Sequence, residues 1–219
     1  MTDDLVVRYK DNNSQRTPCV LVLDGSMSMD GQPIDQLNQG LKVLEEELKE
    51  DVVARTRVRV LVIRVGGAPS MVGDWTDAIE FTAPTLEAGG NTPLGEAMEL
   101  ALHSVAEEKQ RLDAAGISST RPWIFMISDG APTDPGWPAV ADACVQAEQA
   151  KQVAIFPIGV SGADLEALGR FSPRGAAQLD GLRFTDFFLW LSRSVSSASQ
   201  SGPDEDVQLP AIDWARAPT

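Results

Sequence analysis

The chain has 219 residues, of which 43% are hydrophobic, so it is long and apolar enough for one globular domain and is not a disordered chain. Its 18 basic and 32 acidic residues give a formal net charge of −14, which argues against binding to nucleic acid or to an anionic membrane surface. No apolar run has the length of a membrane span, and the N-terminal residues lack the apolar core of a signal peptide, so a cytoplasmic protein is expected.

The predicted elements begin with a strand and a helix. Residues 19–24 form an apolar run that ends in an aspartate, which is typical of a buried strand. Residues 33–50 follow as a helix, with Pro33 suited to its first turn and leucines spaced along one face. A second strand is expected over 57–65. Because no helix separates it from the strand-like segment 71–83, we expect these two to pair antiparallel at an edge of the sheet.

The rest of the chain continues the alternation of helices and strands. In chain order the expected elements are a helix over 94–115 that ends at Gly116, a strand over 123–127, a helix over 137–150, a strand over 153–160, a short helix over 164–170, a short strand within 176–182 and a helix over 184–195. This alternation predicts an α/β fold with a doubly wound, Rossmann-like, mainly parallel sheet that has one antiparallel edge strand and helices on both faces. In such sheets ligands bind outside the carboxyl ends of the strands.

The predicted organisation is a lead-in over residues 1–17, one domain over 18–196 and a C-terminal segment over 197–219. The serine-rich composition of 192–202 predicts a flexible linker into that segment. Residues 207–214 are apolar again. Since an exposed apolar run is unfavourable, we expect it to fold back onto the domain or to dock in a neighbouring chain, with a disordered tail as the alternative.

The two cysteines, Cys19 and Cys144, fall on apolar positions of a predicted strand and a predicted helix. Free cysteines at such positions are usually buried as small apolar side chains. No disulfide is therefore expected, which agrees with a reducing cytosol.

Oxygen-bearing side chains gather in three loops at the expected carboxyl edge of the sheet. Asp24 ends the first strand, and Ser26 and Ser28 follow it. Thr92 precedes the long central helix, and Asp129 lies just past a later strand. These carboxylates and hydroxyls, with no cysteine or histidine among them, suit a hard divalent cation, with Mg²⁺ expected first and Mn²⁺ or Ca²⁺ as alternatives.

Each of these residues also has a plainer interpretation. Asp24, Ser26 and Ser28 alone predict a turn that caps the next helix, and Thr92 predicts a helix N-cap that is compatible with the metal role. Asp129 before a glycine is typical of a bare turn. The convergence of all three loops favours a metal site over these alternatives.

Asp30 and Asp134 lie in the two loops that flank the expected site. They are interpreted as solvated loop aspartates. The alternative places them at the rim of the site, where they contact a ligand or support the metal ligands.

The three segments together resemble the metal-ion-dependent adhesion site of the von Willebrand factor A domain family. The resemblance lies in the Asp-x-Ser-x-Ser pattern at Asp24, in Thr92 within a Gly-Gly-Asn-Thr-Pro-Leu run, and in Ser-Asp-Gly at Asp129. It runs over residues 18–195 and implies that family's fold. It also implies a set of metal ligands: Asp24, Ser26, Ser28, Thr92 and Asp129.

A narrower likeness points to the bacterial tellurium-resistance-associated, TerY-like group of that family. It rests on four segments, 18–20, 89–94, 121–124 and 129–134. This resemblance implies a stress-response role and a partner set that includes a Ser/Thr kinase-like protein and a metal-dependent phosphatase.

The expected function is that of a metal-dependent protein-binding module, a scaffold or regulator and not an enzyme. Hydroxyl ligands are neutral, so an Asp or Glu of a partner protein can complete the shell of the cation. The alternative is a Mg²⁺-dependent phosphohydrolase of the haloacid-dehalogenase type, but its acid/base aspartate would stand where this chain has Ser26. A third interpretation is a vestigial site with the C-terminal tail as the binding element.

Overall fold

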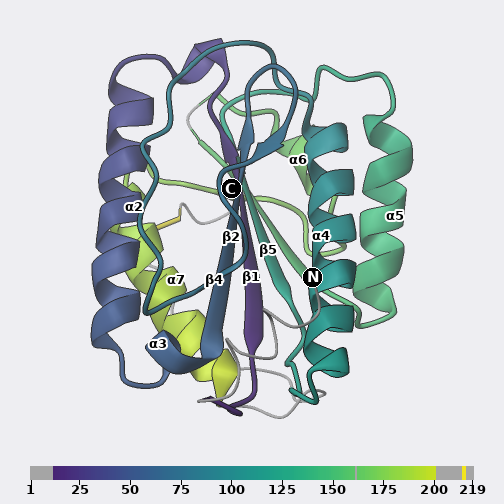
Figure 1. Ribbon diagram of the computed structural model, residues 1–219. Coiled ribbons are helices and arrows are strands. Elements are labelled where there is room, and N and C mark those ends of the chain that lie inside the picture. The colour runs from purple at the N-terminus through teal and green to yellow at the C-terminus, as the bar shows by residue number, and fades with distance from the viewer. Residues whose placement is uncertain (1–11, 161, 201–213, 216–219) are drawn as a thin grey trace.

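The computed structural model describes residues 12–160, 162–200 and 214–215 and shows a twisted sheet between two layers of helices (Figure 1). The strand order is β3-β2-β1-β5-β6-β7, and β4 also pairs with β2. The parallel strands are β1 (Thr17–Asp24), β2 (Val58–Val65), β5 (Trp123–Ser128), β6 (Ala154–Gly159) and β7 (Ala177–Gln178). The short strands β3 (Ser70–Met71) and β4 (Thr76–Asp77) pair antiparallel with β2. The predicted fold class is confirmed, although the antiparallel edge is divided into two short strands instead of one segment over 71–83.

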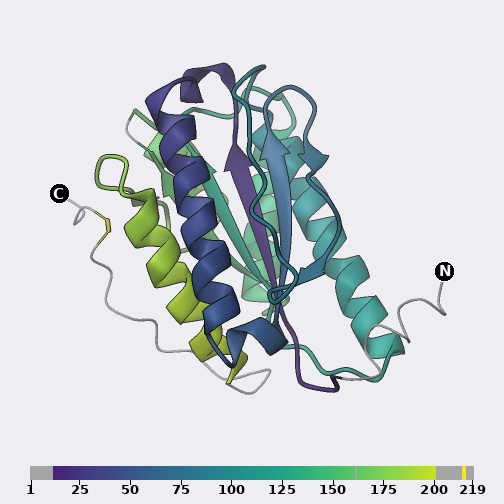
Figure 2. The same ribbon diagram turned by 60° about the vertical axis from the view of Figure 1, so that its left-hand side comes forward.

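Strand β1 lies at the centre of the sheet. All of its residues are buried, as its apolar sequence predicts for a strand covered on both faces. The parallel register places Asp24 beside Val65 of β2 and Leu23 beside Ile127 of β5. Figure 2 shows the arrowheads of neighbouring parallel strands at one edge of the sheet, and the short helix η1 (Met27–Met29) follows β1 at that edge.

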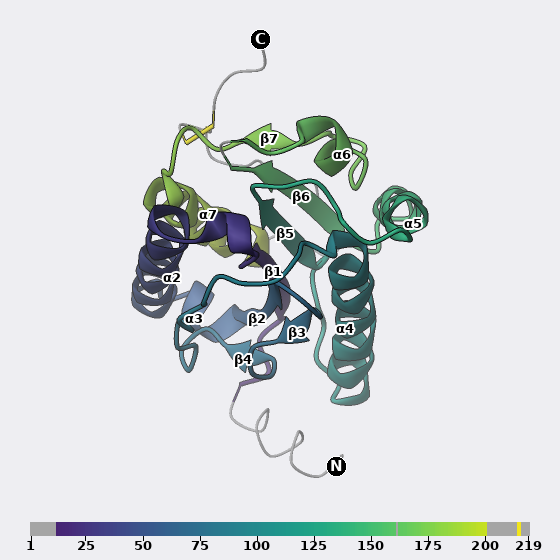
Figure 3. The same cartoon turned by 90° about the horizontal axis from the view of Figure 1, so that it is seen from above.

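Helices cover both faces of the sheet, as predicted (Figure 3). On one face lie α2 (Gln32–Glu50) and α7 (Phe184–Ser199), and on the other lie α4 (Leu94–Ala114) and α5 (Trp137–Gln149). Apolar side chains fill a core on each face of the sheet. Two short helices complete the described elements: α3 (Ala54–Arg57), which was not predicted and directly precedes β2, and α6 (Leu165–Gly169). None of the helices in the described ranges is long and apolar enough to cross a membrane.

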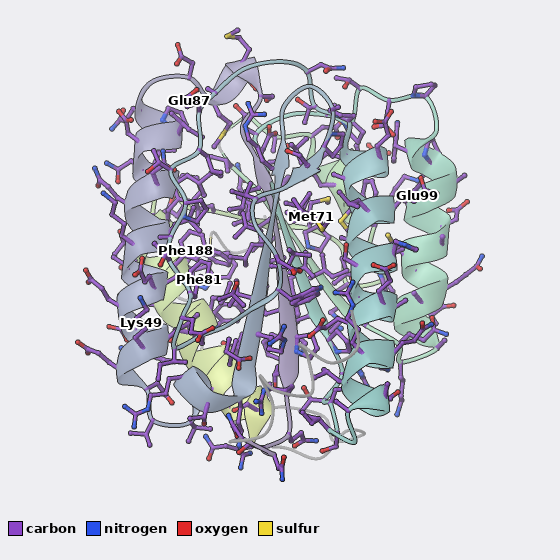
Figure 4. The ribbon with its side chains drawn as sticks, in the orientation of Figure 1. Lys49, Met71, Phe81, Glu87, Glu99 and Phe188 are labelled. Atoms are coloured by element: carbon purple, nitrogen blue, oxygen red, sulfur yellow. The ribbon has the colours of Figure 1, made fainter. Side chains whose placement is uncertain are left out.

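Helices α2 and α7 pack closely because a glycine lies at their contact. A Cβ added at Gly40 would lie 2.5 Å from a ring atom of Phe188, which Figure 4 labels. A larger side chain at residue 40 would therefore push the two helices apart. This contact holds α7 against α2, the helix that follows β1 along the chain.

The flexible linker predicted over 192–202 is wrong for its first part, because α7 continues to Ser199. Buried serines in this stretch find hydrogen-bond partners: Ser196 Oγ donates to Asp51 Oδ2 at 2.9 Å, across to the end of α2. Serine side chains are small, and those whose hydroxyls have hydrogen-bond partners can lie in a closely packed helix contact. The serine content of the sequence alone does not show whether such partners exist. Residues 201–202 lie outside the described part of the chain.

The C-terminal segment docks on the domain where the structure describes it. Trp214 is 2% exposed, and its ring centroid lies 5.0 Å from that of Phe187 and 5.2 Å from that of Trp190, both in α7. The carbonyl of Trp214 accepts a hydrogen bond from the N–H of Asp180 at 2.9 Å. The expected fold-back is therefore seen at Trp214, while residues 207–213 lie outside the described residues.

Cys19 in β1 and Cys144 in α5 are both buried and free. Burial raises the pKa of each thiol to about 12, so neither forms a reactive thiolate at neutral pH. The prediction of two buried free thiols is confirmed.

Candidate metal centre

Four of the five predicted metal-site residues form one chain of hydrogen bonds at the carboxyl edge of the sheet, the edge that faces the viewer in Figure 3. Asp24 accepts a hydrogen bond at Oδ1 from the backbone N–H of Ser26 at 2.8 Å. The Oγ atoms of Ser26 and Ser28 lie 3.0 Å apart, and Ser28 Oγ donates to Asp129 Oδ1 at 2.7 Å. Since Ser28 uses its single hydroxyl proton toward Asp129, Ser26 is the donor in the serine pair. The loops after β1 and β5 are thus brought together.

Asp24 is fully buried, and its second oxygen is held by a residue that the sequence analysis missed. Ser128, the last residue of β5, donates its hydroxyl to Asp24 Oδ2 and accepts the N–H of Gly130 at 3.1 Å. Burial raises the pKa of Asp24, hydrogen bonds from Ser128 and Ser26 act in the opposite direction, and nearby Asp129 adds to the rise. An ionised carboxylate in such a place is unfavourable unless a cation offsets its charge.

Thr92 reaches the site from the loop before α4. Its backbone is fixed by Thr133, whose hydroxyl accepts the N–H of Thr92 at 3.1 Å and whose N–H donates to the carbonyl of Thr92 at 3.0 Å. Thr92 Oγ1 lies 3.7 Å from the point that a Cβ on Gly130 would occupy, so it faces the loop that carries Asp129. The N-cap position of α4 is Pro93, so the interpretation of Thr92 as the helix N-cap is wrong.

The side chain of Asp134 is buried against the start of α4. It is 7% exposed, and its Oδ1 accepts the backbone N–H of Gly95 at 3.1 Å. The interpretation of Asp134 as a solvated loop residue is therefore wrong, and the alternative, in which it contacts a ligand or supports the metal ligands, stays a prediction. The physical reason is that the free N–H groups of a helix start need an acceptor, and this carboxylate supplies one from another loop. Asp30, which follows η1, is exposed as expected.

The rim of the site carries an apolar side chain. Met27 in η1 is 64% exposed, whereas Met29 is buried in the core. The N–H of Met27 donates to the carbonyl of Gly90 at 3.0 Å, which ties η1 to the loop that carries Thr92. An exposed, adaptable side chain on a fixed backbone suits contact with a protein partner.

The donor set fits a hard divalent cation. It consists of carboxylate and hydroxyl oxygens only, the chemistry that Mg²⁺, Mn²⁺ and Ca²⁺ prefer. In the part of the chain that the structure describes, no group of three or more His, Cys, Asp or Glu side chains is placed to hold a metal. Asp24 and Ser26 are buried, Asp129 is half-buried and Ser28 is exposed. The site therefore opens to solvent on the side of Ser28.

Comparisons with known proteins agree with this architecture. The sequence model of the von Willebrand factor type A domain matches residues 19–187. A solved von Willebrand factor type A protein from Catenulispora acidiphila superposes with a TM-score of 0.64 at 13% identity, over 84% of this chain and 43% of that one. The pilus adhesin SpaC from Lactobacillus rhamnosus GG, in its open conformation, gives a TM-score of 0.69 at 14% identity, over 85% and 30% of the two chains.

A third solved structure contains a metal at the corresponding kind of motif. Proximal thread matrix protein 1 from the mussel byssus, described with a zinc-occupied MIDAS motif, gives a TM-score of 0.58 at 12% identity, over 84% of this chain and 49% of that one. At these identities the three structures show the fold alone, and this chain spans less than half of each of them. No curated protein sequence matches the chain.

Proposed function

The chain belongs to the von Willebrand factor type A domain family, and from this premise we propose that it is a metal-dependent protein-binding module. The observation that carries the proposal is the hydrogen-bonded series Asp24–Ser26–Ser28–Asp129 at the carboxyl edge of the sheet. The zinc-occupied MIDAS motif of the mussel byssus protein supports a metal at a site of this kind. We propose Mg²⁺ as the ion, with Mn²⁺ or Ca²⁺ as alternatives.

The side chains that would hold the ion are those of Asp24, Ser26, Ser28, Thr92 and Asp129. A bound divalent cation would supply positive charge with a coordination position open to solvent. Asp24 and Ser26, which are both buried, would hold the ion on the side that faces the protein interior. The more exposed Ser28 and Asp129 would leave room for a carboxylate of the partner on the outer side.

A partner that offers an Asp or Glu is compatible with the acidic character of the chain. The net charge of −14 repels an acidic partner at long range, but ordinary salt screens that repulsion beyond about 8–10 Å. Direct coordination acts at much shorter range. Met27 at the rim favours a partner segment in which an apolar residue accompanies the acidic one.

The proposed biological role is that of a scaffold or regulator in a bacterial, cytoplasmic, tellurium-resistance-like stress response. It is supported by the TerY-like segments of the sequence, among them 89–94 and 129–134. The proposed partner set includes a kinase-like protein and a metal-dependent phosphatase. A phosphohydrolase activity of the chain itself is not supported, because Ser26 occupies the place of the acid/base aspartate and is buried.

Pull-down from a lysate of the native host, in Mg²⁺ and in EDTA, tests the proposed function. We expect a defined set of proteins to be retained in Mg²⁺ and lost in EDTA. We expect Asp24→Ala to reduce that retention by more than about tenfold, the equivalent of about 1.4 kcal/mol of binding free energy. Asp35→Ala is the matched control, because Asp35 is an exposed aspartate in the first turn of α2. Equal retention in both buffers, or equal loss in the two variants, contradicts the proposal.

A further inference from the structure

Arg64 of β2 places its guanidinium among backbone carbonyl groups at the same edge of the sheet. Nη1 donates to the carbonyl of Gly66 at 2.7 Å. Nη2 donates to the carbonyls of Glu87, Gly25 and Gly89 at 2.8, 3.2 and 3.3 Å, and Nε donates to the carbonyl of Glu87 at 3.0 Å. Glu87 is labelled in Figure 4 beside the upper end of α2. One side chain thus binds four carbonyl oxygens.

These carbonyls belong to the loops that carry the proposed metal ligands. Gly25 lies between Asp24 and Ser26, and Gly89 lies three residues before Thr92. The N–H of Gly89 also donates directly to the carbonyl of Gly25 at 2.8 Å. Arg64 therefore joins the loop of the two serines to the loop of the threonine.

The glycines let the carbonyl groups converge on the guanidinium. A Cβ added at Gly66, whose φ is +147°, would lie 2.6 Å from the carbonyl oxygens of both Gly25 and Gly89 and 2.8 Å from Arg64 Nη2. Carbonyl oxygens that gather in this way repel one another unless donors lie between them. The planar guanidinium offers several donors in fixed directions, whereas the ammonium of lysine is a compact point charge.

We propose that Arg64 is a positioning residue of the metal site, which holds the serine-bearing and threonine-bearing loops in the arrangement that binds the cation. This inference rests on the proposed function. The same segment is also anchored farther from the site, where Asn38 and Leu86 exchange hydrogen bonds of 2.9 and 2.8 Å. Those bonds do not reach Gly25, so Arg64 has a coupling role that Asn38 lacks.

The sign of the effect on metal affinity separates positioning from simple electrostatics. A positive charge near a cation site weakens cation binding, so removal of the charge alone would strengthen it. Loss of positioning has the opposite effect. Arg64→Met, which removes both the charge and the donors, is therefore expected to weaken binding if Arg64 positions the loops.

The test combines amide hydrogen exchange in EDTA with titration by Mn²⁺. In EDTA we expect Arg64→Met to speed exchange at the amides of Met27 and Gly89 by about tenfold or more, because both bonds join the two loops. We expect its Mn²⁺ dissociation constant to rise by about 10–100-fold, as for other residues that orient metal ligands. Arg64→Lys keeps the charge and is expected to show smaller changes in the same directions. It also serves as the test variant if Arg64→Met does not fold.

Arg57→Met is the matched control, because Arg57 Nη1 donates to the carbonyl of Ser199 at 2.6 Å, away from the metal loops. We expect it to change neither the two amides nor the Mn²⁺ affinity. Unchanged exchange in Arg64→Met, or Mn²⁺ binding that is equal or tighter, overturns the positioning role. If the wild-type protein binds no Mn²⁺, the proposed function fails. The amide hydrogen exchange in EDTA then decides by itself whether Arg64 orders the loops.

Discussion

Asp24→Asn is expected to raise the melting temperature in EDTA and to lower it, relative to the unchanged protein, in saturating Mg²⁺. Asp24 is fully buried beside Ser128, and burial is the largest cause of its raised pKa. In the metal-free protein its charge is therefore a cost to the folded state. Asparagine keeps the shape of the side chain and carries no charge.

The dependence on pH follows from the same shift. Because the pKa of Asp24 is higher in the folded than in the unfolded state, the folded state holds its proton more firmly. The cost of the ionised group is fully present above the folded-state pKa and disappears as the pH falls through that value toward the unfolded one. The advantage of Asp24→Asn in EDTA should accordingly be largest above the folded-state pKa of Asp24 and should shrink as the pH falls through that pKa toward the ordinary range of an aspartate.

Metal binding reverses the order of the two proteins. A ligand at one hundred times its dissociation constant stabilises the folded state by about 2.7 kcal/mol. For a chain of this size that corresponds to a rise of roughly 5–11 °C in melting temperature. The Asp24→Asn variant lacks a carboxylate ligand, so Mg²⁺ is expected to raise its melting temperature only a little. Thermal unfolding of both proteins in EDTA and in Mg²⁺ measures the effect, and a Mg²⁺ response of equal size in both would remove Asp24 from the metal site.

Trp214→Ala is expected to destabilise the domain by about 3 kcal/mol, the lower end of the range for a buried tryptophan. The lower end applies because release of Trp214 and Ala215 from the domain returns conformational entropy. The indole contacts Phe187 and Trp190 of α7, and the neighbouring Ala215 forms an antiparallel bridge with Leu179. Denaturant unfolding measures the loss.

Trp214→Phe is the informative control. Among the described residues, the buried indole N–H of Trp214 has no hydrogen-bond partner, so its removal is not a loss. We expect the phenylalanine variant to keep most of the stability that the alanine variant loses. Equal stability of Trp214→Ala and the unchanged protein would show that the docked segment does not stabilise the domain.

The strands, the main helices and the convergence of the three loops could be predicted from the sequence. The run before Asp24 is apolar without interruption because β1 is covered on both faces, and parallel strands bring their carboxyl ends to one edge. The spacing of hydroxyls after that strand then indicated the candidate site. Thr92 was predicted at the same edge because its loop precedes the long central helix, and the resemblance to the family's motif supports its inclusion.

Other features depend on contacts between distant residues that leave no periodic pattern. Ser128 supports Asp24 through its hydroxyl, and its place directly before Asp129 was the only signal in the sequence. Asp134 caps α4 from another loop, and Arg64 binds carbonyls, which every residue carries. The serine-rich end of α7, up to Ser199, has a composition typical of a linker. Composition does not show which serine hydroxyls find hydrogen-bond partners in the folded protein.

A crystal structure with Mn²⁺, located by its anomalous scattering, tests most directly the claim that this edge of the sheet holds a divalent cation. We expect one strong anomalous peak among the side chains of Asp24, Ser26, Ser28, Thr92 and Asp129. In a matching Mg²⁺ crystal the ion should lie about 2.0–2.1 Å from its oxygen ligands. A crystal in saturating Mn²⁺ with no peak at this edge, or with the ion bound only elsewhere, would contradict the account.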